Sequence, residues 1–369
     1  MFFVLLPTFE CNLRCTYCFE EHPEGRWDIP KTTQVLDAVF DVCQQKGVEQ
    51  IRLHWQGGEA LVMGQGYWEE VLPLAQKKAA AADISLYQAM QTNLVEYDTW
   101  VGVLAKRFLD GRLGTSFEPF PDRRYSGGDG TRFQAAWKVA YARAIRDDLE
   151  VGVLSLLNDQ VLAQDASKYL DRLAGEFGIR HMRFSLPFGR EPGARGYWID
   201  PVKAGRFLVA TYQHWKELGG KDFMELEPFT YLEASLRNHG EPGRRTCMYT
   251  PNCAETATSI LPDGNVVLCD NFAQNTTFSP MGNVFAGSLA TEAFGPWRQQ
   301  MVEAVASLYN DECCACPYLS VCNAGCLVRS RLSADGKSRS YHYCETMKML
   351  LAAIEAEVVQ VTSTAIREK

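Results

Sequence analysis

The sequence predicts an α/β protein, an open, partial (β/α)6 barrel of the TIM type followed by a small cysteine-rich C-terminal domain. Two observations predict this fold class. Short apolar runs alternate with helical patterns six times, and nine of the thirteen cysteines fall between Cys247 and Cys344. Repeated β-α units imply a parallel sheet with right-handed crossovers, and six units are too few to close an eight-stranded barrel.

The predicted strands are runs rich in apolar or β-branched residues. They cover residues 2–7, 51–56, 84–92, 112–118, 150–158 and 181–189. Helical patterns separate them at about 30–46, 66–82, 97–108, 132–147, 159–176 and 201–218. We expect four regions along the chain. They are the barrel at 1–200, a connecting region at 201–245, the cysteine-rich domain at 246–350 and a terminal helix at 351–369.

Polar motifs follow the strands at their C-terminal ends, where such sheets carry their chemistry. Cys11 follows the first strand, Gly57-Gly58-Glu59 the second, Gln91-Thr92-Asn93 ends the third, and Ser116 lies on the fourth. We therefore expect these residues to converge on one mouth of the barrel.

The composition is that of an ordinary globular protein, 46% hydrophobic and 22% charged, with a net charge of −8. This charge gives no basic face for nucleic acid or an anionic membrane. The N-terminal run "MFFVLLP" is too short to span a bilayer and lacks the features of a signal peptide. We expect a cytoplasmic protein, where disulfides are disfavoured, so the cysteines indicate metal.

Three cysteines, Cys11, Cys15 and Cys18, have the spacing C-x3-C-x2-C in "CNLRCTYC". A structural zinc site normally takes four protein ligands, and no clear fourth ligand is present. A four-iron cluster fits better, because three irons can take one cysteine each and the fourth stays open for another ligand.

With "WQGGEAL" after the second strand, this motif resembles the radical S-adenosylmethionine superfamily. The resemblance covers the barrel in order, through "QTN" and "GTSFE". It implies that S-adenosylmethionine chelates the unique iron through its amino and carboxylate groups. One electron from the reduced cluster then cleaves the sulfonium to methionine and a 5′-deoxyadenosyl radical, which removes a hydrogen atom from the substrate.

The resemblance also implies cofactor-binding residues. Gly57 and Gly58 let the backbone approach closely, and Glu59 accepts from the ligand ammonium. The resemblance also places Gln91 and Asn93 among the cofactor-binding residues. Further candidates are Tyr17 against adenine, Ser116 on a ribose hydroxyl and Lys138 on the methionine carboxylate. Two alternatives stay open. Tyr17 could be only a packed aromatic residue, and Lys138 could be only a solvated lysine on a helix.

Eight of the nine cysteines in the tail have a fixed order of spacings. It is similar to the SPASM domain, which carries two auxiliary [4Fe–4S] clusters, so that the chain would hold three clusters. Zinc remains the alternative, since eight thiolates could hold two zinc ions. By resemblance the first auxiliary cluster is ligated by Cys247, Cys253, Cys269 and Cys326. By the same resemblance the second is ligated by Cys313, Cys316, Cys322 and Cys344.

Full cysteine ligation leaves the auxiliary clusters no site for substrate, so they would move electrons. Such clusters could also have a structural role, because metal ligation stabilises a domain that has only a small core. Two cysteines are left over. Cys43 lies in an amphipathic helix and is expected to be a small core residue, and Cys314 receives no role.

The cysteine spacing resembles that of anaerobic sulfatase-maturating enzymes, which oxidise a cysteine or serine of a client protein to formylglycine. Asp270 directly follows Cys269, where those enzymes have an aspartate acting as base. Where relatives usually read "SMDGP", this chain reads "TSFEPF", so Glu118 replaces the aspartate as a candidate catalytic residue. The chain starts close to its first strand, so we expect no leader-peptide-binding domain.

Two classes of function remain open. The first is oxidation or cross-linking of a peptide or protein side chain, with the auxiliary clusters taking the second electron. The second is dehydrogenation or epimerisation of a small sugar or aminocyclitol. The GGE motif argues against a third, non-enzymatic electron carrier. Either enzyme would need an electron donor of the flavodoxin or ferredoxin type, and neither involves nucleic acid or membrane.

Overall fold

The computed structural model describes the chain except for residues 19, 21, 121–129, 188–197, 239–252, 273–280, 288, 290–292, 308, 333–337 and 368–369. The chain forms two compact units, and each is described by itself. The first contains Met1–Gly152 and Ala254–Glu303. The second contains Val153–Gly189, Tyr197–Cys253 and Ala304–Lys369.

The first unit is built on a five-stranded sheet. Its strand order is β3 (Ser85–Met90), β2 (Gln50–Trp55), β1 (Phe2–Leu5), β8 (Ala257–Ile260) and β9 (Val266–Val267). Strand β1 lies in the middle and pairs in parallel with both β2 and β8. A strand from the cysteine-rich tail therefore completes the sheet that begins at the N-terminus.

Strand β4 (Arg112–Ser116) continues the first unit beside the end of β3. Gln91 and Gly114 form a parallel bridge, and the Thr92 N–H donates to the Gly114 carbonyl at 2.9 Å. Strand β5 (Glu150–Leu156) starts in this unit, where the Glu150 N–H donates to Gly111 O at 2.9 Å. The parallel order expected for the first strands is confirmed.

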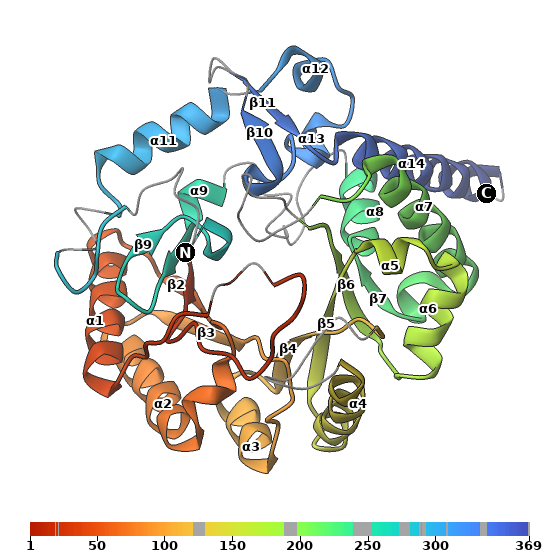
Figure 1. Cartoon of the computed structure of the whole chain (residues 1–369). Helices are drawn as coiled ribbons and strands as arrows, with labels where there is room; N and C mark the ends of the chain where they lie inside the picture. The colour runs from red at the N-terminus through yellow and green to blue at the C-terminus, as the bar shows by residue number, and fades with distance from the viewer. Residues whose placement is uncertain are drawn as a thin grey trace. The chain divides into compact units, whose positions relative to one another are not determined.

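Helices follow these strands. They are α1 (Ile29–Gln45), η1 (Ala60–Met63), α2 (Gln65–Ala81), α3 (Thr99–Phe108) and α4 (Gly130–Arg146). Helices α1, α2 and α3 lie side by side along the sheet (Figure 1). On α1 the buried residues follow helical spacing, and Cys43 is buried among them, as expected.

Aspartates begin several helices. Asp28 caps α1 by accepting from Lys31 N at 2.8 Å, with proline in the first turn. Asp200 begins α7 (Pro201–Glu217) in the same way, accepting from Lys203 N at 2.8 Å. Such caps satisfy amide donors that have no partner inside the helix, and proline has the backbone angle that the first turn requires.

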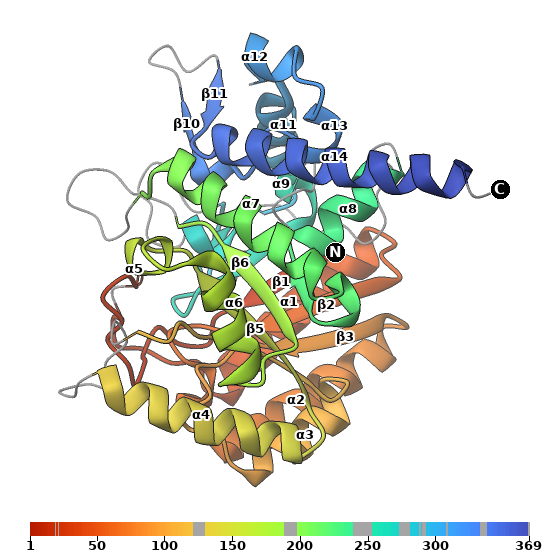
Figure 2. The ribbon, with the colours of Figure 1, turned by 90° about the vertical axis from the view of Figure 1, so that its right-hand side faces the viewer.

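The second unit contains the rest of β5 and two further strands of the same sheet. Strands β6 (His181–Ser185) and β7 (Glu225–Glu227) pair with one another in parallel, and β5 pairs in parallel with β6. Helix α14 (Cys344–Arg367) packs along α7 (Figure 2). The other elements of this unit are α5 (Asp159–Leu162), α6 (Ala166–Gly175), η2 (Gly220–Asp222), α8 (Phe229–Arg237), α12 (Asp311–Cys314), α13 (Leu319–Cys322), η5 (Leu327–Arg329), β10 (Ser330–Leu332) and β11 (Arg339–Tyr341).

The remaining short elements are α9 (Cys253–Thr256), η4 (Asp270–Phe272) and α11 (Pro296–Ser307).

One expected helix is wrong. The pattern at 159–176 forms two helices, α5 and α6, because Asp165 caps the second helix by accepting from Lys168 N at 2.9 Å. The terminal helix begins at Cys344 rather than at 351. In the part of the chain that the structure describes, no helix has both the length and the apolar character needed to cross a membrane.

Candidate active site

The GGE turn after β2 lies against the backbone that leads into the cysteine loop. Gly58 N–H donates to Thr8 O at 3.0 Å, and Glu59 N–H donates to Glu10 O at 2.9 Å. A Cβ on Gly57 would lie 2.2 Å from Thr8 O, and one on Gly58 would lie 2.1 Å from the Phe9 carbonyl. Gly57 also has a φ of +146°. The glycines are required because two backbone segments meet here.

Glu59 is a buried carboxylate that connects the GGE turn to the end of β3. Its Oε1 accepts from Leu61 N at 2.9 Å and from the Thr92 hydroxyl at 2.6 Å, and its Oε2 accepts from Asn93 N at 2.6 Å. Burial raises the pKa of Glu59, and these three donors lower it in part. Three of about four acceptor positions are therefore occupied by the protein, which leaves one on Oε2 for the expected ligand ammonium.

Asn93 links the same network to the cysteine loop. Its Nδ2 donates to Asn12 Oδ1 at 2.7 Å, and its Oδ1 accepts from Val95 N at 2.9 Å. Asn12 also donates to Glu96 Oε1 at 3.2 Å. The structure thus brings together the cysteine loop, the GGE turn and the QTN segment, as expected from their places at strand ends.

The three N-terminal thiols lie in one loop. The Leu13 N–H donates to Cys11 Sγ at 3.3 Å, and the Cys18 N–H donates to Cys15 O at 3.1 Å. Burial raises the pKa of Cys11 to about 12, with smaller contributions from Glu59, Cys15 and Cys18. Three partly buried thiols in one loop fit three irons of a four-iron cluster, since iron binds them as thiolates.

The remaining expected cofactor residues divide into two groups. Gln91 Nε2 donates to Ser116 Oγ at 3.2 Å, so these two residues meet at the ends of β3 and β4. The Tyr17 hydroxyl from the cysteine loop donates to the buried carboxylate of Glu118. Lys138 lies exposed on α4. Its role on the methionine carboxylate stays a prediction.

Asp270 lies at the same edge of the sheet. Gln56, which directly precedes the GGE turn, donates from Nε2 to Asp270 Oδ2 at 2.7 Å. The Cys269 thiol donates to Asp270 Oδ1 at 3.1 Å, and Asn271 Nδ2 donates to the Cys269 sulfur at 3.3 Å. Our sequence reasoning overlooked Gln56, although it stands inside the quoted "WQGGEAL" motif.

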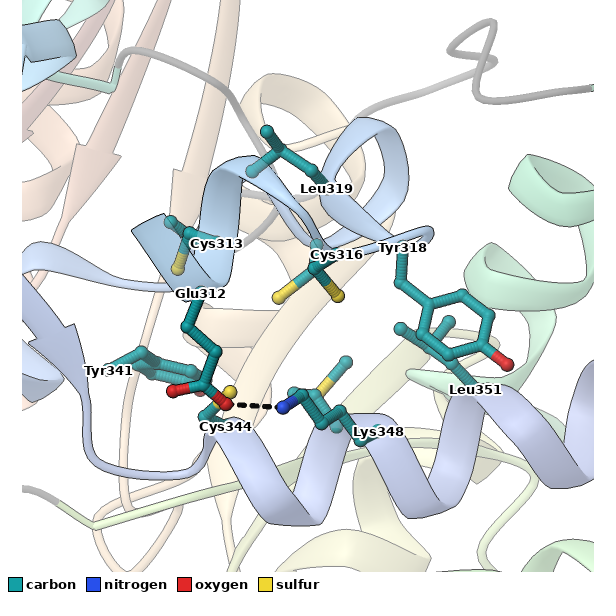
Figure 3. Close-up of a pocket in the computed structure, with 12 residues that line it drawn as sticks. Glu312, Cys313, Cys316, Tyr318, Leu319, Tyr341, Cys344, Lys348 and Leu351 are labelled. Atoms are coloured by element: carbon teal, nitrogen blue, oxygen red, sulfur yellow. Dashed lines mark hydrogen bonds and ion pairs between the residues drawn. The ribbon is translucent and has the colours of Figure 1, made fainter. Parts of the chain in front are cut away.

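The four cysteines expected to hold the second auxiliary cluster line one pocket (Figure 3). The empty space in this pocket is about 390 Å³, open solvent included. Its other lining residues are mostly apolar or aromatic, and they are Tyr318, Leu319, Ala324, Tyr341, Met347 and Leu351. Lys348 and Glu312 also line it, and they form an ion pair.

These thiols influence one another. Burial raises the pKa of Cys322 to about 12, followed by repulsion from Cys344, Cys313 and Cys316. The four thiols line one pocket, and thiols are the soft ligands that iron–sulfur clusters and zinc take. The residues therefore fit the expected cluster.

The first auxiliary set is divided in this structure. Cys269 belongs to the first unit, Cys253 and Cys326 belong to the second, and Cys247 lies outside the described residues. This ligand set stays a prediction. Cys314 is exposed. Among the described residues, no group of three or more His, Cys, Asp or Glu side chains surrounds a single metal-ion position, so a cluster on the four pocket thiols stays a prediction as well.

Comparisons with known proteins were made on sequence and on structure. No family model matches the chain. A serine-type anaerobic sulfatase-maturating enzyme of Klebsiella aerogenes is 24% identical over 349 residues, covering 89% of this chain and 79% of that protein. A cysteine-type enzyme of Clostridium perfringens is 22% identical over 358 residues, covering 92% and 91%.

The fold was compared with solved structures. The structure of native anSMEcpe with bound AdoMet and Kp18Cys peptide matches with a TM-score of 0.81 at 18% identity, covering 98% of this chain and 99% of that one. Streptococcus suis SuiB bound to S-adenosylmethionine matches with a TM-score of 0.58 at 14% identity, covering 89% and 73%. The partial TIM-type barrel with a cysteine-rich C-terminal part is thereby confirmed. The chain is thus similar in sequence to anaerobic sulfatase-maturating enzymes of the serine and cysteine types, and in fold to a solved structure of anSMEcpe, as its motifs predict.

Proposed function

We propose that this chain is a radical S-adenosylmethionine oxidoreductase that oxidises one cysteine or serine side chain of a peptide or protein. The observation that carries the proposal is the 2.7 Å hydrogen bond between Gln56 and Asp270. It fixes a carboxylate next to a predicted auxiliary-cluster cysteine and beside the turn that supports the first cysteine loop. The relatives of serine and cysteine type, and a matching structure with a bound peptide, support a peptide substrate.

The proposed cofactors are S-adenosylmethionine and three [4Fe–4S] clusters on the predicted cysteine sets. When bound, S-adenosylmethionine and the cluster on Cys11, Cys15 and Cys18 supply a 5′-deoxyadenosyl radical that takes one hydrogen atom from the substrate carbon. For the carbon to form a double bond to sulfur or oxygen, the substrate must then lose one proton and one electron. The proton would go to a base of this chain, and auxiliary clusters held by the predicted cysteine sets would supply an acceptor for the electron.

Asp270 is the proposed base. Gln56 holds Oδ2, while the hydrogen bond on Oδ1 comes from the Cys269 thiol. A cysteine that ligates iron has lost its proton, so this hydrogen bond would end in the loaded enzyme. Oδ1 would then be available to accept the proton of the substrate thiol or hydroxyl.

Glu118 is proposed to position Tyr17 rather than to touch the reacting atoms. Both side chains are described, and the Tyr17 hydroxyl donates to the Glu118 carboxylate. This contact would fix the aromatic ring of Tyr17 in the cysteine loop, where it is expected to lie against adenine. Lys138, Ser116 and Gln91 remain proposed cofactor contacts.

The proposal is tested with anaerobically reconstituted protein, S-adenosylmethionine and dithionite. Matched peptides with serine, cysteine or alanine at the target position are compared with a panel of aminocyclitols. We expect 5′-deoxyadenosine together with a two-dalton loss in the serine peptide. In the cysteine peptide the same loss precedes hydrolysis to the aldehyde. A two-dalton loss in an aminocyclitol but in no peptide would contradict the proposal.

Asp270→Ala tests the base. We expect product to fall by about 10²- to 10⁴-fold, while S-adenosylmethionine cleavage without product continues. Asp41→Ala, which removes an exposed carboxylate of α1, is the matched control and should keep full product yield. Undiminished product in Asp270→Ala would remove Asp270 as the base. Replacing dithionite with a reduced flavodoxin or ferredoxin tests the proposed cytoplasmic electron donor.

A further inference from the structure

Arg339 is a buried cation in the second unit, on β11. Its side chain is 3% exposed, and β11 pairs with β10 in an antiparallel ladder. A buried guanidinium normally has strong partners, because the loss of hydration is costly. The contacts of Arg339 are therefore informative.

The hydrogen bonds of Arg339 are long and incomplete. Its two terminal nitrogens donate to Gly325 O at 3.4 Å and to Asn323 O at 3.3 Å. Its Nε has no hydrogen-bond partner among the described residues. The guanidinium also lies 5.3 Å from the centre of the Tyr309 ring. Buried N–H groups of this kind are rare in folded proteins, and they occur where a redox group, an ion or a water molecule lies nearby.

The surroundings indicate which group that is. Arg339 binds the carbonyls of the segment that connects Cys322 to Cys326, and it acts electrostatically on Cys313. Burial raises the pKa of Cys313, and the positive charge of Arg339 opposes this effect. Cys313 and Cys322 both line the pocket of Figure 3.

The connecting segment has little freedom to move away. Residues Asn323, Ala324 and Gly325 all have positive φ, between 50° and 70°. A Cβ on Gly325 would lie 2.4 Å from the Tyr341 ring. Ala324 of this segment lines the pocket, so the segment that Arg339 binds forms part of the pocket wall.

We propose that Arg339 tunes the second auxiliary cluster, holding it at a higher reduction potential than its four thiolates alone would give. This inference rests on the proposed function in one respect, which is that the second auxiliary cluster is present. Reduction adds one negative charge to a site already surrounded by thiolates, and a buried cation stabilises the added charge. Hydrogen bonds to the sulfurs and the local charge both determine the potentials of such clusters.

Lys348 offers a matched comparison at the same pocket. It also carries a positive charge near Cys344 and Cys316, but its side chain is 36% exposed and paired with Glu312. Solvent and the paired carboxylate weaken its field. The two cations thus differ in burial at one cluster.

The test is an anaerobic potentiometric titration of the reconstituted full chain with dithionite, followed by electron paramagnetic resonance. Cys344→Ser identifies the signal of the second auxiliary cluster. We expect Arg339→Met to reduce the equilibrium constant for its reduction about tenfold, a fall of about 59 mV for one electron. Arg339→Lys should lower the reduction potential by less than Arg339→Met does. Lys348→Met should lower it by less than half as much as Arg339→Met. The iron and sulfide content of all three variants should be unchanged.

An unchanged potential in Arg339→Met, or equal shifts in Arg339→Met and Lys348→Met, would overturn the inference. If Arg339→Met does not fold, Arg339→Lys decides, because a fall in potential smaller than about 59 mV supports tuning by charge, whereas a fall of about 59 mV or more with the charge retained contradicts it. The titration contains no substrate. A protein that oxidises no peptide but shows the expected shifts would therefore refute the proposed function and leave this inference standing.

Discussion

The two thiol sites of this chain differ in what surrounds the sulfurs. Around the N-terminal loop, Glu59, Asn93 and Asn12 form a polar network. Around the C-terminal pocket, most of the wall is apolar or aromatic. A polar surrounding suits a site that must also hold a polar ligand, whereas an apolar one suits a closed cluster that stores an electron. On the proposed function, the same ligand type would serve two purposes according to its neighbours.

The largest expected effect comes from removing a thiol at the N-terminal site. Cys15→Ala should abolish both 5′-deoxyadenosine formation and product, because the open iron cannot form without its three ligands. Iron content should fall by about one third while the C-terminal clusters remain. Anaerobic chemical iron analysis with product detection checks this. If Cys15→Ala still cleaved S-adenosylmethionine, the N-terminal thiols would not be the site of the first cluster.

The corresponding change at the C-terminal pocket should separate the two activities. Cys322→Ala is expected to abolish product while S-adenosylmethionine cleavage continues, because the N-terminal site is untouched. Loss of an expected ligand should also lower the melting temperature, since cluster binding stabilises the fold. If product persisted, the pocket would have no part in electron transfer.

Glu59→Gln tests the polar network. Its amide nitrogen would face the Asn93 N–H or another donor, so we expect a loss of about 1–3 kcal/mol in the free energy of unfolding. Burial raises the folded-state pKa of Glu59 above its unfolded value. The stability from this group is present below the unfolded pKa and is lost as pH rises through the folded pKa.

The stability gap between wild type and Glu59→Gln should therefore narrow as the pH rises above the ordinary glutamate range. Thermal unfolding between acidic and neutral pH measures the gap. A gap that widened with pH would show that the three donors outweigh burial.

The smallest effect is expected at the rim of the C-terminal pocket. Glu312→Gln removes the partner of Lys348, and both side chains are partly or largely exposed. Exposed ion pairs contribute little, so the melting temperature should not change measurably. A large change would mean that the rim, and not the thiols, stabilises the pocket.

Much of the barrel could be predicted from the sequence because local patterns determine strands and helices. Observed α1, Ile29–Gln45, lies within one residue of its expected bounds at each end. Parallel strands also place their C-terminal ends together, so the meeting of Glu59 and Asn93 was predictable. The split at Asp165 was not, because a capping aspartate inside a continuous apolar pattern gives a weak signal.

Long-range contacts could not be predicted. The pairing of β1 with β8 joins residues far apart in the chain, and no local pattern specifies such a partner. For the same reason, Gln56 could not be assigned to Asp270 from the sequence. The long, incomplete hydrogen bonds of Arg339 likewise depend on side-chain placement, which spacing does not encode.

The insertion of β8 beside β1 has a consequence for synthesis of the protein. Residues 257–260 leave the ribosome long after the N-terminal strand, so one edge of that strand stays unpaired during most of translation. Contacts of such large sequence separation form slowly, and an open strand edge is prone to aggregate. The loop that would receive the first cluster therefore gains its final support only after residues 257–260 have been made.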